Sequence, residues 1–236
     1  MDDTNANTDA GDPAKSNWLR IYAVMIGLGI LCSFAIVLTY ELTREPILNN
    51  QAAFRGEAGL AVLPGAESIR VFHQDPDGRF VEGAGTTEGA ELIFAGYDAD
   101  GRLVGLAIEA AGKGYQDVIR LIYGYVPDGE RIVAFRVLQS RETPGLGDRV
   151  ESDPGFQANF DNLDVRLNES KDDVANPITF VPQGTKESPW QIDGLSGATV
   201  TSRAIADIVS QSTRDWIPRI VARIEDFRRF SGGDKP

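Results

Sequence analysis

The segment DGLSGATVTSRA, residues 193–204, gathers hydroxyl groups directly ahead of a helical pattern. Ser196 is placed to cap a helix, and Gly197 and Ala198 are small enough for another molecule to approach the backbone. Thr199 would then lie in the first helical turn, where unpaired amides and the helix dipole favour an anion. The segment indicates either an ordinary helix start without a ligand or a threonine beside a bound phosphate.

A second polar segment, RETPGLGDR at residues 141–149, follows a strand-like run. Pro144 and Gly145 form a turn signal, and Glu142 and Thr143 place polar groups at the strand end. Taken alone, such a segment is more typical of a surface turn than of a binding loop.

Neither segment contains a nucleophile–base pair or the spacing of metal ligands. The chain has a single histidine, His73, and a single cysteine, Cys32, which argues against a hydrolytic triad and against a zinc site. A net charge of −12 argues against a nucleic-acid-binding protein, which normally shows a basic stripe. The composition, 42% hydrophobic and 25% charged, is that of an ordinary globular chain.

A run of twenty uncharged residues, Ile21–Tyr40, predicts a membrane anchor. As a helix it would extend roughly 30 Å, the thickness of the hydrocarbon core of a bilayer. Trp18 and Tyr40 lie at its ends, where aromatic rings favour the headgroup level. A cleaved signal peptide would normally have a shorter apolar region and a small-residue cleavage site, and no such site follows.

The orientation of the anchor is not decided by its flanking charges. Lys15 and Arg20 precede the run, and Arg44 and Arg55 follow it at a similar distance. The long C-terminal part has no cysteine, which suits an oxidising compartment without proving one.

The remaining pattern predicts four parts. Residues 1–17 are expected to be a disordered tail, residues 18–43 the transmembrane helix, and residues 44–63 a connecting helix that begins around Pro46. Residues 64–236 are expected to form one domain.

Six short β-rich runs, with the Asp-Gly turns DPDG, DADG and PDGE among the breakers between them, indicate a mainly antiparallel sheet in this domain. The runs are SIRVFHQD, RFVEGA, ELIFAGYD, RLVGLAIEAAG, VIRLIYGYV and RIVAFRVLQSRE. Residues 161–188 are mostly polar and suggest a long excursion. Two helical patterns follow, the second beginning around Asp215 because Pro218 is tolerated only near a helix start. The predicted fold class is α+β, with helices packed on the sheet.

Together the two polar segments resemble a known family. SGAT at 196–199, preceded by Asp193-Gly194, resembles the flavinylation motif of the FMN-binding domain family, and ETPGLG at 142–147 resembles its second signature. GKGYQDVIRLIYGYV at 112–126 resembles the strand region ahead of that signature. One anchor followed by this domain is similar to the G subunit of the Rnf ion-translocating electron-transport complex.

The resemblance implies that FMN is joined through its phosphate to Thr199 by a separate flavin transferase. Ser196, Gly197 and Ala198 would shape this attachment site, with Ser196 as the helix cap. Thr201, two residues after Thr199, is expected to point away from it. Contacts with the ring or the ribityl chain would come from Glu142, Thr143, Leu146 and Gly147. The family often has Gly-Tyr-x-Gly where this chain has residues 114–117, GYQD, so the part played by that loop stays open.

The implied function is that of an electron-transfer subunit, which exchanges electrons with other membrane subunits of an Rnf-type complex linked to ferredoxin, NAD and ion movement. The domain would face outward from the bacterial inner membrane. Two alternatives stay open: the C subunit of a Na⁺-translocating NADH:quinone reductase, and a membrane-anchored scaffold or sensor in which SGAT is only a helix cap.

Overall fold

A computed structural model of the chain describes residues 13–83 and 92–229. The chain divides into two units, residues 1–52 and 53–236. Helix α1 (Pro13–Ala61) begins in the first unit and ends in the second. Its segment Arg20–Arg44, with a mean hydropathy of 2.5, is long and apolar enough to cross a membrane.

Helix α1 differs from the predicted parts at both ends. It begins at Pro13, so residues 13–17 are helical, whereas residues 1–12 of the expected tail lie outside the described residues. The expected connecting helix, residues 44–63, is not a separate element, because α1 continues through Pro46. A proline removes one backbone hydrogen bond and crowds the carbonyl four residues earlier, but the residues on both sides of Pro46 remain helical.

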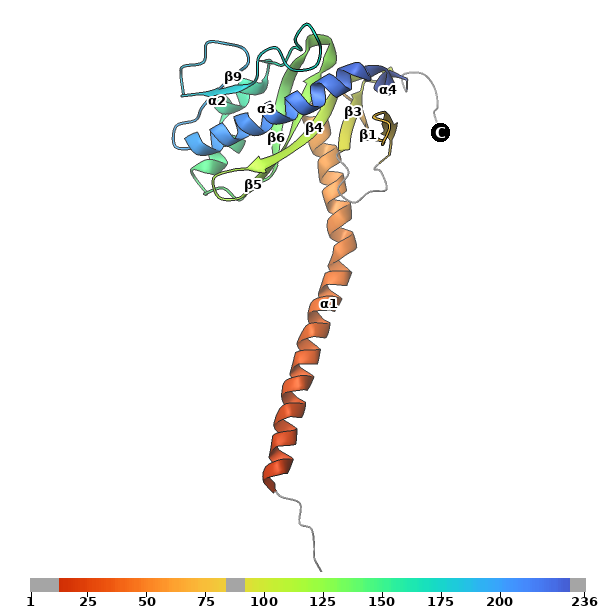
Figure 1. The fold of residues 1–236 in the computed structure, drawn as a ribbon, viewed down its shortest axis with the longest axis vertical. Helices are drawn as coiled ribbons and strands as arrows, with labels where there is room; N and C mark the ends of the chain where they lie inside the picture. Colours follow the sequence, from red (N-terminus) through yellow and green to blue (C-terminus); the bar gives the residue numbers. More distant parts are fainter. Residues whose placement is uncertain (1–12, 84–91, 230–236) are drawn as a thin grey trace, which may run out of the picture. The chain divides into compact units, whose positions relative to one another are not determined.

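The second unit is built on a seven-stranded antiparallel sheet with the order β2-β1-β3-β4-β5-β6-β7. Strands β1, β3, β4, β5 and β6 are labelled in Figure 1. The six predicted strand runs correspond to β1–β6, and the short edge strand β7 lies within the segment expected to be a loop. The strands are β1 (Ser68–Gln74), β2 (Phe80–Glu82), β3 (Leu92–Tyr97), β4 (Leu103–Lys113), β5 (Val118–Val126), β6 (Arg131–Gln139) and β7 (Leu163–Asp164).

Helix α3 (Thr199–Ala222) crosses one face of this sheet (Figure 1). The predicted start of a second helix around Asp215 was wrong, because α3 continues through Pro218 to Ala222, ahead of the short α4 (Ile224–Arg228). Buried positions from Ile205 to Ile220 explain the single helix, since they anchor the segments before and after the proline on the same core.

The remaining short elements lie between β5 and α3. They are η1 (Pro127–Gly129) at the β5–β6 turn, η2 (Gly147–Glu151), α2 (Pro154–Gln157), η3 (Ala158–Phe160) and the parallel strand pair β8 (Thr179–Val181) and β9 (Gln191–Asp193). The expected fold class, a mainly antiparallel sheet with packed helices after an apolar N-terminal helix, is confirmed.

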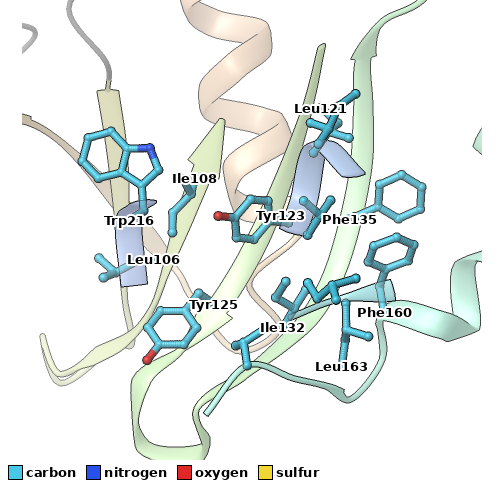
Figure 2. Close-up of a cluster of buried hydrophobic side chains, with 14 of the residues drawn as sticks. Leu106, Ile108, Leu121, Tyr123, Tyr125, Ile132, Phe135, Phe160, Leu163 and Trp216 are labelled. Carbon is cyan, nitrogen blue, oxygen red and sulfur yellow. The ribbon is translucent and has the colours of Figure 1, made fainter. Parts of the chain in front are cut away.

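The larger core lies between α3 and one face of the sheet. Figure 2 shows part of it, including Tyr123 of β5, Phe135 of β6 and Trp216 of α3. The rings of Phe135 and Phe160 stack with their centroids 4.0 Å apart, which joins η3 to the sheet. This packing fixes the line of α3 and therefore the position of its first turn.

The opposite face of the sheet is covered by the residues that end α1 and follow it. Ala58, Val62 and Leu63 are buried there with apolar side chains of β3, β4 and β5. Glycines at 96, 105 and 124 make room for them: a Cβ on Gly96 or Gly105 would come within 3.0 Å of Leu63, and one on Gly124 would collide with the Val62 carbonyl oxygen. The end of α1 therefore belongs to the core of the domain and is more than a connection.

Candidate functional site

The first turn of α3 is reached through a sharp backbone turn at Gly197, whose φ of +85° favours glycine. Ala198 occupies the N-cap position and supplies no side-chain hydrogen bond. Thr199 is the first helical residue, and its side chain is exposed. The helix therefore presents an uncapped N-terminus with a hydroxyl group beside it, which is a favourable place for an anion.

The prediction that Ser196 caps α3 was wrong. The helix begins three residues later, so the Ser196 side chain stands outside the capping position. Its backbone is used instead: the amide donates to Gln183 Oε1 at 3.0 Å, and the carbonyl accepts from Arg149 Nη1 at 3.1 Å. The hydroxyl that stabilises this loop is that of Ser202, which accepts from the Leu195 amide at 3.1 Å.

A buried carboxylate connects three loops at this end of the domain. Glu142 is only 5% exposed. Its Oε1 accepts from the backbone N–H of Gln116 at 3.1 Å, and its Oε2 accepts from the Thr201 hydroxyl at 2.8 Å. A further bond from Gln116 Nε2 to Thr143 Oγ1, at 2.9 Å, joins the first two loops again. The three segments that it connects, 114–117, 142–147 and 197–201, are called here the site segments.

Two glycines let the site segments approach Glu142 closely. A Cβ added to Gly114 would lie 2.5 Å from Glu142 Oε1. A Cβ added to Gly147 would lie 2.9 Å from both Glu142 Oε2 and Thr201 Oγ1. The second glycine of ETPGLG is thus required by packing against the carboxylate, in addition to leaving the backbone accessible.

Replacement of Gly147 by alanine is expected to destabilise the fold by about 1–3 kcal/mol, because the new methyl group overpacks the Glu142–Thr201 contact. Denaturant unfolding of the full-length chain in detergent measures this change. Gly56→Ala is the matched control, since its added methyl group has no neighbour within 4 Å. Equal stability of the two variants would contradict the tight packing at Gly147.

The site segments enclose a cavity of about 350 Å³, within the roughly 300–1,000 Å³ usual for ligand pockets. Seven of the eight residues predicted to form the site line it: Glu142, Thr143, Leu146, Gly147, Gly197, Ala198 and Thr199. Ser196 does not. Sequence reasoning missed Tyr115, Val200 and Thr201, which also line the cavity.

The missed residues have different explanations. Thr201 was expected to point away from Thr199. It is buried where Thr199 is exposed, and it lines the cavity as well because it donates to Glu142. Tyr115 belongs to the loop that departs from the Gly-Tyr-x-Gly pattern, and its aromatic ring was the available signal. Tyr115, Leu146 and Val200 leave large apolar side chains exposed around the cavity, which suits a ligand with a flat apolar part.

The polar segment 161–188 and its neighbours form hydrogen bonds with Asp193, at the start of the SGAT loop. Strand β8 pairs with β9, and the following turn donates the Gly184 amide to Asp193 Oδ1 and Oδ2, each at 2.8 Å. The Asn159 side chain accepts from the Asp193 amide at 2.9 Å and from Lys186 Nζ at 3.3 Å. Partial burial lowers the pKa of Lys186, whereas the nearby Asp193 carboxylate raises it less. These bonds hold the Asp193-Gly194 start of the SGAT loop.

A larger hollow of about 600 Å³ lies further along α3, lined mainly by acidic and polar side chains. Its arginine, Arg214, is already bonded to Asp173 at 2.7 Å. Within residues 13–83 and 92–229, no group of three or more His, Cys, Asp or Glu side chains is arranged to hold a metal ion. The smaller cavity, where the predicted residues meet, is therefore the better candidate site.

The fold and the placement of these loops define a known class of domain. The chain shares its fold with the crystal structure of NqrC from Shewanella oneidensis, with a TM-score of 0.53 and 20% identity over 76% of this chain and 98% of that one. Residues 114–213 match the FMN-binding domain and include all three site segments. Residues 114–213 are therefore similar to the FMN-binding domain.

Similarity to whole proteins extends beyond this domain. The chain is 28% identical over 201 residues to the G subunit of an ion-translocating oxidoreductase complex from Methanosarcina acetivorans, which covers 84% of this chain and 93% of the relative. It is also 28% identical over 132 residues to the G subunit of the proton-translocating ferredoxin:NAD⁺ oxidoreductase complex of Clostridium ljungdahlii, over 56% of this chain and 58% of that one.

Proposed function

We propose that this protein is a membrane-anchored flavoprotein subunit that carries FMN covalently on Thr199 and passes electrons within an Rnf-type ion-translocating oxidoreductase complex. The observation that carries the proposal is the position of Thr199, exposed at the uncapped start of α3 and on the wall of the cavity. Two relatives similar to this chain are named as the G subunits of such complexes.

The residues present fit both parts of FMN. The phosphate is an anion, and the free amides of the first turn of α3 favour a negative charge beside the Thr199 hydroxyl. The ring system is flat and largely apolar, and it would pack against Leu146, Val200 and Tyr115. When bound, the flavin supplies the redox chemistry, and the chain supplies position and electrostatics.

The tether has a physical purpose. The cavity is open at a rim of exposed side chains, so a noncovalently held ligand could dissociate into the surrounding water. A phosphoester to Thr199 would keep the cofactor at the site throughout repeated electron transfer. The hydroxyl lies on the surface, where a flavin transferase can reach it without unfolding the domain.

The proposal includes the setting of the protein. The apolar segment of α1 anchors it in the bacterial inner membrane, and the C-terminal domain lies on the extracytoplasmic side, where the absence of cysteine after Cys32 causes no difficulty. Its partners are other membrane subunits of the complex. The likeness to NqrC supports a shared fold, and the two relatives named above favour the Rnf-type assignment over a quinone reductase.

Co-expression of the full-length chain with a flavin transferase tests the proposal. A denaturing gel of the membranes is expected to show flavin fluorescence at the mass of this chain, and intact-mass measurement is expected to show one added FMN less one water. A dark band, with a second flavinylated protein labelled in the same cells, would contradict the carrier function and favour the scaffold alternative.

A further inference from the structure

Among the described residues, Glu142 has no cationic partner for its charge, unlike two aspartates near the cavity. Asp117, in the neighbouring site segment, pairs with Arg141 at 3.3 Å. Asp153, below the ETPGLG loop, pairs with Arg149 at 3.6 Å. No lysine, arginine or histidine in the described parts of the chain forms an ion pair with Glu142, although it is more buried than either aspartate.

The two bonds to Glu142 stabilise a carboxylate without neutralising it. The backbone N–H of Gln116 and the hydroxyl of Thr201 each donate a hydrogen bond to one carboxylate oxygen. An ionised carboxylate accepts at both oxygens in this way. Gly114 and Gly147 pack directly on the side chain, so it has no space to turn towards solvent. A fixed negative charge is therefore held in the wall of the cavity.

The buried Glu142 carboxylate interacts strongly with the charge of a molecule bound in the cavity. Coulomb interactions are several times stronger at a partly buried position than in bulk water, because less solvent screens them. Adding electrons to a molecule in the cavity adds negative charge close to the carboxylate. The energy of the reduced form is therefore raised relative to that of the oxidised form.

We infer that Glu142 sets the reduction potential of the flavin in this cavity, holding it lower than the same site would without the charge. The inference rests on the proposed function, because it requires FMN in the cavity. It changes the role expected for Glu142 from the sequence: the side chain positions the three site segments and acts on the ring through its electric field, since both of its oxygens are already bonded to the protein.

Redox titration of the purified full-length chain, flavinylated and in detergent, tests this role in Glu142→Gln. The amide has the size of the carboxylate and can keep both contacts, so the main change is the loss of the charge. The midpoint potential is expected to rise. At the wild-type midpoint, the ratio of reduced to oxidised flavin should increase at least tenfold, which is about 30 mV for a two-electron couple.

Asp207→Asn is the matched control, because it removes the same charge from an exposed position on α3 outside the cavity. Its ratio should change by less than twofold. An equally small change in Glu142→Gln, or a fall in its potential, would overturn the inference. Wild-type protein without covalent flavin would instead count against the proposed function, so the two failures are distinguishable.

A second variant, Thr201→Val, tests the role of the Glu142 charge if Glu142→Gln does not attach flavin. Thr201→Val removes one donor from the carboxylate but keeps its charge, so the field at the cavity becomes stronger and the potential should fall. An unchanged or higher potential in Thr201→Val would overturn the role of the charge. A purely structural role for Glu142 predicts altered loading in both variants without opposite shifts in potential.

Discussion

Replacement of Thr199 by valine is expected to abolish covalent attachment of FMN and to leave the domain folded. Valine has the shape of threonine without the oxygen that would form the phosphoester. The residue is exposed at the start of α3, so the substitution disturbs no buried contact. In-gel flavin fluorescence and intact mass, measured after co-expression with the flavin transferase, should both fall to background.

Thr201→Val is the matched control for this experiment. Both threonines line the same cavity, but the hydroxyl of Thr201 is buried and already donates to Glu142. This variant should keep covalent flavin. Loss of flavin from Thr201→Val together with its retention in Thr199→Val would show that the wrong hydroxyl has been assigned.

Replacement of Leu63 by alanine is expected to destabilise the domain by roughly 2–5 kcal/mol, the usual cost of a large cavity in a core. Leu63 is 1% exposed and fills the groove formed by the glycines at 96, 105 and 124. That loss is a large share of the roughly 5–15 kcal/mol that stabilises a typical domain. Chemical denaturation of the full-length protein in detergent measures it.

Leu60→Ala provides the comparison, because Leu60 is 38% exposed and its replacement should destabilise the domain much less.

The same packing predicts where a soluble form of the domain can begin. A chain starting at residue 53 keeps Ala58, Val62 and Leu63, whereas one starting at residue 64, the boundary expected from the sequence, leaves Phe94, Ala107 and Ile122 uncovered. The shorter form should aggregate, and a stable shorter form would contradict the assignment of these residues to the core.

The sheet was predictable because its signals are local. Alternating apolar runs indicate the strands, Asp-Gly turns indicate the β3–β4 and β5–β6 hairpins, and consecutive strands from β3 to β6 pair with their neighbours along the chain. The order around β1 is different, since β1 pairs with both β2 and β3 and the turn residues alone do not specify this. The edge strand β7 was missed because two residues carry no periodicity.

Helix ends were predicted less well, because tertiary packing overrides local rules there. Pro218 suggested a helix start, yet Ile217 and Ile220 on either side of it are buried in one core and keep α3 continuous. Ser196 has the right side chain for a cap, but the turn at Gly197 moves the helix start beyond its reach. Arg149, which bonds the Ser196 carbonyl oxygen, is 47 positions away in the sequence.

Most of the candidate site was predictable from two motifs, whereas its internal connections were not. The motifs place Thr199 and the ETPGLG residues on the same cavity, but they do not show that Glu142 bonds Thr201. Thr201 is buried whereas Thr199 is exposed, and spacing along a helix does not show that the Glu142 loop packs on its first turn. Such contacts depend on the docking of α3, which no short segment of sequence specifies.

The connections made by Glu142 also determine when the site can form during folding. It bonds residues 26 positions before it and 59 positions after it, so the cavity requires two chain closures in addition to the sheet. A nascent chain that ends before Thr201 can pair β1 to β6, but it has neither the start of α3 nor the second partner of Glu142. The cavity is thus completed late, after the C-terminal helix has docked.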